Sequence, residues 1–202
     1  MIGPKERLSR REGTNLFVKG ARSFSAKEAW GKRQTKPGQH GVQPSKLSSY
    51  ARQLREKQKV KRLYGMKEKQ FRRFYALAVK TAKNSNQDKG YVMLQMLERR
   101  LDNVIYVAML AKSKNASRQF VSHGHVYVNG KRVTIPSFVV RVNDVIELKE
   151  DMYQYGKVDY KGPMVPAWLN VAKNTITVAS LPTRQQIDPS IRENLIVELY
   201  SR

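Results

Sequence analysis

Few residues of this chain could carry out catalysis. It has no cysteine and three histidines, His40, His123 and His125, the last two separated by a single glycine. A metal centre needs three or four suitable ligands, and the acids nearest to this His-Gly-His segment in sequence are Asp102 and Asp144. The sequence has no glycine-rich phosphate loop of the Walker or dinucleotide type. We therefore expect no enzyme activity, no metal and no cofactor.

Basic side chains are the abundant chemical groups. The 202 residues include 39 Lys and Arg against 16 Asp and Glu, a formal net charge of +23. Residues 1–90 hold 24 of these cations and six of the acids, and residues 91–202 hold the other 15 and ten. Solubility needs a net charge of only about 2–8 on a small domain. We expect a polyanionic partner, nucleic acid rather than a membrane surface, and no apolar run approaches the ~18–20 residues of a membrane span.

Residues 1–46 are rich in Gly, Pro, Ser, Lys and Arg and contain few apolar residues. This composition predicts an irregular basic extension that is ordered mainly by a partner. The run KPGQHG at residues 36–41 is a turn cluster, in which glycine permits a close approach of the backbone. The candidate RNA contacts of the extension are Arg10, Arg11, Lys36, Gln39 and His40.

Two amphipathic helices are predicted next, at residues 47–64 and 67–84. Their expected apolar stripes are Leu47, Tyr50, Ala51 and Leu54 on the first, and Phe71, Phe74, Tyr75 and Ala78 on the second. Aromatic residues can stack on bases, but this helical spacing favours a core role. The first helix gathers cations around a single acid, Glu56, so pairing within the helix cannot neutralise them and phosphate contact is favoured over mere solvation. The candidate contacts on both helices are Arg52, Arg55, Lys59, Arg62, Lys69, Arg72 and Arg73.

The most informative stretch extends from Leu97 to Leu148. A third helix is predicted at about residues 91–110, and its inward positions are Leu94, Leu97, Leu101, Val104, Ile105 and Ala108. A short basic helix is expected near residues 115–123. Asn129-Gly130, between two β-prone runs, then predicts a tight hairpin whose turn residues have positive φ. Further strands are expected at residues 144–148 and 175–178.

Polar and basic residues of this stretch are expected to form one face toward RNA. The amino end of the short helix presents N–H groups and a positive dipole that suit phosphate. Asp102 is expected to form an ion pair with a neighbouring basic side chain. The candidate contacts are Arg99, Arg100, Lys114, Arg118, His123, His125, Asn129 and Lys131.

The end of the chain is predicted to be irregular and then helical. Residues 151–185 are expected to be loop with short strands. Asp188 is expected to cap a helix that starts at Pro189 and has apolar positions Ile191, Leu195 and Leu199. Together the elements predict an α+β fold.

Residues 97–148 resemble the S-four-type RNA-binding domain through the blocks LERRLDNV, RQFVSHGHVYVNGKRV and DVIEL. The runs KPGQHG, LREKQ, EKQF and VPAWL and the ending LIVELYSR are similar to bacterial-type ribosomal protein S-four of the small subunit, from about Gly3 to Arg202. The resemblance implies a basic N-terminal extension (1–46) and a helical domain (47–90, completed by a C-terminal helix at 186–202). A small RNA-binding domain of helices and a short antiparallel sheet (91–185) is inserted into the helical domain.

The resemblance also implies a function. The family is a primary binder of small-subunit rRNA that recognises a multi-helix junction in the 5′ region and nucleates assembly of the subunit body. It lines the path by which mRNA enters, beside the third and fifth small-subunit proteins, and affects decoding accuracy. A cytoplasmic ribosome is expected, and an organellar one is left open. The alternatives are an RNA-binding translational regulator and a targeting subunit of an RNA-modifying enzyme, although the chain is too small for the catalytic domain of the latter.

One departure from the family concerns metal. Many relatives carry four zinc-binding cysteines in the extension. Motif alignment places Glu6, Ser9, Ser23 and Glu28 at those positions here. Serine hydroxyls are poor substitutes for thiolates as zinc ligands, so we expect a cysteine-free form without zinc, whose extension is held by its own packing, ion pairs and rRNA.

Overall fold

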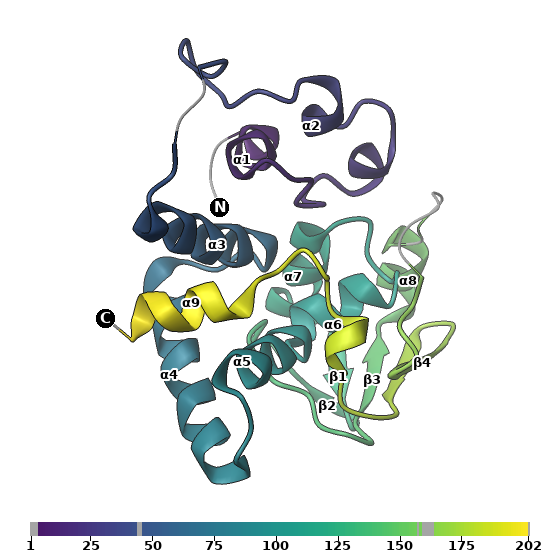
Figure 1. Cartoon of the computed structure of the whole chain (residues 1–202). Helices are drawn as coiled ribbons and strands as arrows, with labels where there is room; N and C mark the ends of the chain where they lie inside the picture. The colour runs from purple at the N-terminus through teal and green to yellow at the C-terminus, as the bar shows by residue number, and fades with distance from the viewer. Residues whose placement is uncertain (1–3, 44–45, 157, 159–163, 202) are drawn as a thin grey trace. The chain divides into compact units, whose positions relative to one another are not determined.

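The computed structural model describes residues 4–43, 46–156, 158 and 164–201. The chain divides into two compact units, the first formed by Met1–Leu94 with Asp188–Arg202 and the second by Gln95–Ile187. The fold is α+β, as predicted (Figure 1). The division into an extension, a helical domain and an inserted domain, with boundaries at residues 46, 90 and 185, stays a prediction.

The first unit is helical. Its elements are α1 (Lys5–Glu12), η1 (Gly20–Phe24), α2 (Ala29–Lys32), α3 (Ser49–Leu63), α4 (Glu68–Ser85), the start of α5 (Lys89–Glu98) and α9 (Glu193–Tyr200). Residues 5–32 are therefore more regular than the irregular extension expected. Leu16 and Val18 are 1% and 7% exposed, so the extension buries apolar side chains of its own, which composition alone did not reveal.

The packing of α3 differs from the expected stripe. Leu47 and Tyr50 are 44% and 52% exposed, whereas Val60 and Leu63 near the carboxyl end are buried. The reason is α9, which returns from the far end of the sequence and packs along α3 (Figure 1). Gln53 Nε2 donates to Glu198 Oε2 at 2.9 Å across this contact. On α4 the expected core is partly confirmed, because Phe71 and Ala78 are buried while Phe74 and Tyr75 are half-buried.

The predicted helical start at Pro189 is wrong. The Asp188 carboxylate accepts from the backbone N–H of Ser190 at 2.8 Å, which makes a local turn, and α9 begins only at Glu193. Ile191 is buried as expected, but within the helix Ile196, not Leu195, is fully buried. Because Ile191 lies before α9, it is not part of one helical stripe with Leu195 and Leu199.

The second unit combines helices with a five-stranded sheet. Its elements are the end of α5, then α6 (Leu101–Val107), α7 (Lys114–Ser122), β1 (Val126–Val128), β2 (Lys131–Arg132), β3 (Val145–Leu148), α8 (Glu150–Gly156), β4 (Leu169–Ala172), β5 (Thr175–Val178) and η2 (Arg184–Gln186). The sheet is antiparallel, in the order β2-β1-β3-β5-β4. The predicted hairpin is confirmed: Asn129 and Gly130 have φ of 50° and 74°. β4 and β5 are short strands of the kind expected among residues 151–185, whereas α8 was not predicted.

The single helix predicted at residues 91–110 is wrong. It is interrupted at Arg99-Arg100, between α5 and α6, where Arg100 adopts an extended backbone. The segment near residues 136–140 causes the break: Val140 N donates to Arg99 O at 3.0 Å and Leu101 N donates to Phe138 O at 2.8 Å. The inward positions are nevertheless confirmed, because all six predicted residues are at most 2% exposed.

Candidate nucleic-acid interface

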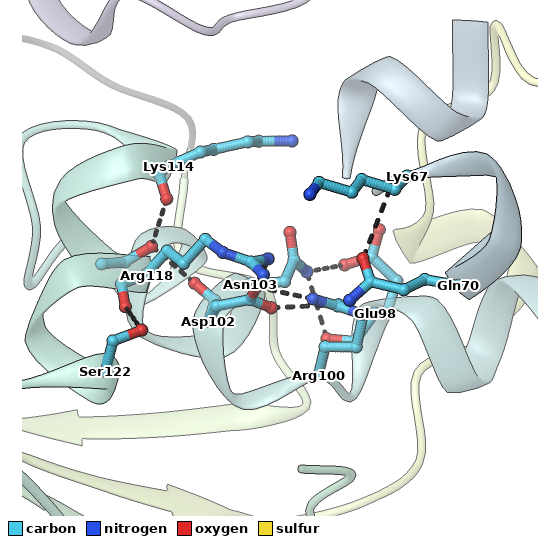
Figure 2. Close-up of polar contacts among 10 residues, drawn as sticks. Lys67, Gln70, Glu98, Arg100, Asp102, Asn103, Lys114, Arg118 and Ser122 are labelled. Atoms are coloured by element: carbon cyan, nitrogen blue, oxygen red, sulfur yellow. Dashed lines mark hydrogen bonds and ion pairs between the residues drawn. The ribbon is translucent and has the colours of Figure 1, made fainter. Parts of the chain in front are cut away.

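Asp102 is the centre of a charge cluster in the second unit (Figure 2). Arg100 contacts it through two hydrogen bonds, Nε to Oδ1 at 3.0 Å and Nη2 to Oδ2 at 2.6 Å. Arg118, on α7, donates from Nη1 to Oδ2 at 3.2 Å. The exposed fractions of the two arginine side chains are very different, 3% for Arg100 and 39% for Arg118. The placement of Arg100 on an exposed RNA face is therefore wrong, while Arg118 reaches solvent.

The position of α7 is fixed by serine side chains. Ser113 caps the helix by accepting from Ala116 N at 3.2 Å, which satisfies one of the unpaired amides of the first turn. Ser117, fully buried, donates from Oγ to Asp102 O at 2.7 Å and so attaches α7 to α6. Lys114 Nζ lies 5.4 Å from the centre of the Tyr106 ring, a cation–π distance. The helix thus holds Lys114 and Arg118 one turn apart.

Asn129, predicted as an RNA contact, has a structural role in the hairpin. Its Nδ2 donates to Asp144 Oδ1 and its Oδ1 accepts from Val145 N, both at 2.9 Å. Lys131 is exposed beside it. The sequence interpretation missed Arg132, which donates to Gly124 O at 2.9 Å and to His123 O at 3.2 Å. A Cβ on Gly124 would lie 2.1 Å from Arg132 Nε, and Gly124 has a φ of +74°. The glycine was therefore the one signal in the sequence that another group approaches the backbone closely here.

His123 and His125 have few possible metal ligands near them. Their rings lie 6.1 Å apart, and the described residues contain no group of three or more His, Cys, Asp and Glu that could hold an ion. Arg99, expected on the same face, is half-buried and donates from Nε to Val140 O at 2.8 Å. Burial lowers the pKa of its guanidinium, and the nearby Arg141 adds to the effect. Arg99 therefore holds the segment at Val140 in place, and only part of its side chain faces solvent.

The cations of α3 are mostly paired with acids, and most of these acids come from outside the helix, which the expectation of phosphate contact did not consider. Arg55 and Arg62 both contact Glu12 Oε1, which α1 brings from more than forty residues away, and the Glu12 side chain is 1% exposed. Lys59 pairs with Glu56 at 2.8 Å and donates to Ser190 O at 2.5 Å. Burial raises the pKa of Glu12, and the surrounding basic residues only partly oppose this. Of the four predicted cations, Arg52 is the exposed one.

The remaining candidates of the first unit differ in exposure. Arg10 is half-buried and holds the 35–36 segment, donating to Thr35 O at 3.0 Å and Lys36 O at 3.1 Å. Lys36 is half-buried. The exposed candidates are Arg11, Gln39, His40, Lys69, Arg72 and Arg73.

The four residues expected at the zinc-cysteine positions of the family, Glu6, Ser9, Ser23 and Glu28, lie around one small cavity. Ser9 Oγ accepts from Leu16 N at 3.3 Å and Ser23 Oγ accepts from Lys19 N at 3.1 Å. Glu28 caps α2 through Trp30 N and Gly31 N, and Glu6 pairs with Arg22. The oxygen atoms of these four side chains already contact backbone N–H groups or an arginine. The residues present therefore do not fit a tetrahedral zinc ion.

The described surface can therefore bind anions, but its side chains do not form a catalytic arrangement. Exposed arginines and lysines suit phosphate oxygens, whereas the acids near the candidates are engaged in ion pairs. No helix in the described part of the chain is long and apolar enough to cross a bilayer. Such a fold and surface are those of a nucleic-acid-binding protein.

The comparisons identify the family. Residues 1–98 match the family described as ribosomal protein S4/S9 N-terminal domain, and residues 99–146 match the S4 domain. The chain is 49% identical to small ribosomal subunit protein uS4 of Caldicellulosiruptor saccharolyticus, over all of this chain and 98% of the relative. It is 48% identical to the uS4 protein of Clostridioides difficile, over 99% of this chain and 98% of the relative. The chain belongs to the uS4 family of structural, rRNA-binding small-subunit ribosomal proteins, which are not enzymes.

Proposed function

We propose that this protein binds a multi-helix junction in the 5′ region of small-subunit rRNA and thereby nucleates assembly of the subunit body. In the same proposal it lines the path by which mRNA enters, beside the third and fifth small-subunit proteins, and affects decoding accuracy in a cytoplasmic ribosome. The resemblance to ribosomal protein S-four supports these roles. The proposal includes the three-part organisation of extension, helical domain and inserted RNA-binding domain.

The observation that carries the proposal is the contrast between exposed cations and engaged acids. Arg52, Arg72 and Arg73 are exposed on α3 and α4, and Arg118 and Lys131 reach solvent in the second unit. RNA helices are recognised mostly through phosphates and shape, which cations on rigid helices can contact. The proposed rRNA contacts are Arg11, Gln39, His40, Arg52, Lys69, Arg72, Arg73, Lys114, Arg118, His123, His125 and Lys131.

Salt dependence of rRNA binding tests this interface. Each phosphate contact contributes about 0.7–0.9 to the slope of log K against log salt. Replacing Arg52, Arg72 and Arg73 together by Gln should lower the slope by roughly two to three and leave the melting temperature nearly unchanged. The matched control replaces the same three arginines by Lys, which keeps the charge and should keep most of the slope. An unchanged slope in the Gln variant would remove these helices from the interface.

Reconstitution tests the role in assembly. Small-subunit rRNA and the other small-subunit proteins should fail to form a compact body when this protein is omitted, and its addition should restore the body. A regulator or a targeting subunit would instead leave body formation unaffected and would not co-sediment with small subunits in high salt. Either result would overturn the proposed role in assembly.

A further inference from the structure

A groove in the first unit combines cations with an aromatic ring. Its volume is about 680 Å³, and α1, the 34–43 segment, α2 and α3 all contribute to its wall. The lining residues that matter here are Arg10, Arg11, Trp30, His40, Val42 and Arg55. We call it the Trp30 groove.

The walls of the Trp30 groove are held by contacts within the protein. Arg10 fastens the 35–36 segment to α1 through Thr35 O, Thr35 Oγ1 and Lys36 O, at 3.0–3.2 Å. On the other side, Arg55 of α3 is fastened to α1 by Glu12 at 3.2 Å. Gly41 closes the 36–41 turn so tightly that a Cβ would lie 1.9 Å from Lys36 O. The groove is therefore formed before a ligand arrives, which lowers the entropic cost of binding.

The charge of the groove is positive. Five basic residues line it, Arg10, Arg11, Lys36, His40 and Arg55, against Glu12 as the one acid among its lining residues. The Glu12 side chain is 1% exposed and is shared between two arginines. Solvent in the groove thus faces mainly arginine and lysine, with Arg11 and the imidazole of His40 exposed at its edge. An anionic ligand is favoured there.

Apolar surface lies beside these cations. Trp30 is half-buried, and its ring lies against Gly13, where an added Cβ would be 3.7 Å from the ring. Val42 is 75% exposed and Leu47 is 44% exposed on the same lining. Simple ions do not need an aromatic wall, but an unpaired nucleotide does, because its base stacks on aromatic rings while its phosphate contacts basic residues.

We propose that the Trp30 groove receives one unpaired nucleotide of the bound rRNA, with its base against Trp30 and its phosphate against Arg11 and His40. This inference rests on the proposed rRNA-binding function and adds a site for a splayed-out base to it. Nucleotides in helices keep their bases stacked within the duplex, so the groove selects a bulge, loop or junction strand.

Variants of Trp30 in the full-length protein test the inference, with a small-subunit 5′-region rRNA fragment as the probe. Base–aromatic stacking corresponds to a loss of roughly 5- to 140-fold in affinity when the ring is removed. Trp30→Ala and Trp30→Leu should both show such a loss, with an unchanged salt slope, and Trp30→Phe should bind nearly as well as the wild type. Tyr50→Ala removes an exposed aromatic residue of the same unit that does not line the groove, and it should leave binding unchanged.

The outcomes separate this site from the function as a whole. If Trp30→Leu bound as well as Trp30→Phe, the ring would act by packing alone and the inference would fail, while rRNA binding by the wild type would still stand. If the wild type did not bind the fragment, the proposed function itself would fail. Fluorescence adds a direct measurement: the fragment should quench the signal that Trp30→Phe lacks. A free mononucleotide that quenched it at the same low concentration would overturn the assignment to rRNA.

Discussion

Asp102 accepts a hydrogen bond from Arg118 at 3.2 Å while its carboxylate is already held by two hydrogen bonds from Arg100. The buried arginine neutralises and fixes the carboxylate, and the carboxylate in turn orients the half-exposed arginine of α7. Two residues that are sixteen positions apart thus connect the core of the second unit to its basic surface. The two arginines should therefore respond differently to substitution.

Arg118→Ala should weaken rRNA binding with little loss of stability. An exposed ion pair contributes about 0–1 kcal/mol, because solvent screens it, and Arg100 still holds Asp102. One lost phosphate contact should lower the salt slope by about 0.7–0.9. Filter binding at several salt concentrations measures the slope, and Arg118→Lys is the control that retains the charge. A normal slope for a folded Arg118→Ala protein would place the RNA elsewhere.

Arg100→Ala should destabilise the second unit. Removing Arg100 breaks the buried ion pair, because its side chain is 3% exposed, and leaves the Asp102 carboxylate with only the half-exposed Arg118 as a charged partner. Breaking a buried ion pair costs about 3–5 kcal/mol, and Arg118 should keep the loss toward the lower end. Urea denaturation followed by the fluorescence of buried Trp168 measures this loss. Arg118→Ala is the matched control on the same carboxylate. Equal stability of the two variants would contradict the distinction between the buried and exposed arginines.

Leu101→Ala should cost about 2–5 kcal/mol, because it removes a fully buried side chain from the core of the second unit. Binding to rRNA should persist until the unit unfolds. The measurement pairs a urea curve with an rRNA titration below the unfolding transition. Weak rRNA binding by a protein that is still folded would give Leu101 a role beyond packing.

Local patterns predicted the elements whose cause is local. Asn129-Gly130 gave the hairpin because its turn needs positive φ, which these residues tolerate. The strand at residues 175–178 and the buried positions from Leu94 to Ala108 followed from apolar spacing. The matches to the two families likewise agree with the motifs that were recognised.

The errors arise where a distant segment decides. The helix breaks at Arg100 because the segment near residue 138 pairs with it, and periodicity cannot register such a partner. Arg55 and Arg62 of α3 are neutralised by Glu12, whose role depends on how α1 packs. Arg100 itself carries no sign of burial in the sequence, since an arginine beside another arginine usually indicates a solvated surface. Candidate sites were thus identified by residue type, but their exposure required the fold.

The pH dependence of stability should identify Glu12. Burial raises its pKa above 4.5, so the folded state binds this proton more tightly than the unfolded state. Its contribution to the free energy of unfolding is then fully present below pH 4.5 and is lost as pH rises through the folded pKa. The wild type should therefore lose stability relative to Glu12→Gln as pH rises above about 4.5. Urea curves across this range measure the difference.

Glu68 supplies the opposite case as a control. Burial is the largest single influence on this carboxyl and raises its pKa, but hydrogen bonds and charges from Lys57 and Lys61 outweigh it, so the pKa is lowered overall. Its contribution is present above pH 4.5 and is lost as pH falls through the folded pKa. As pH rises, the wild type should thus gain stability relative to Glu68→Gln, whereas it should lose stability relative to Glu12→Gln. The same sign for both variants would refute the assignment to Glu12.

The purified protein should contain no stoichiometric zinc, and chelation should not change its melting temperature. Ser9, Ser23 and Glu28 accept backbone N–H groups and Glu6 pairs with Arg22, so the extension is closed by contacts that need no ion. Because these four residues surround one cavity, replacing all of them by Cys should create a tetrahedral thiolate site. That variant should bind one zinc and should melt earlier once a chelator removes it, which makes it the positive control for metal analysis. One zinc per chain in the wild type, lost together with stability on chelation, would show that the polar contacts do not replace the metal.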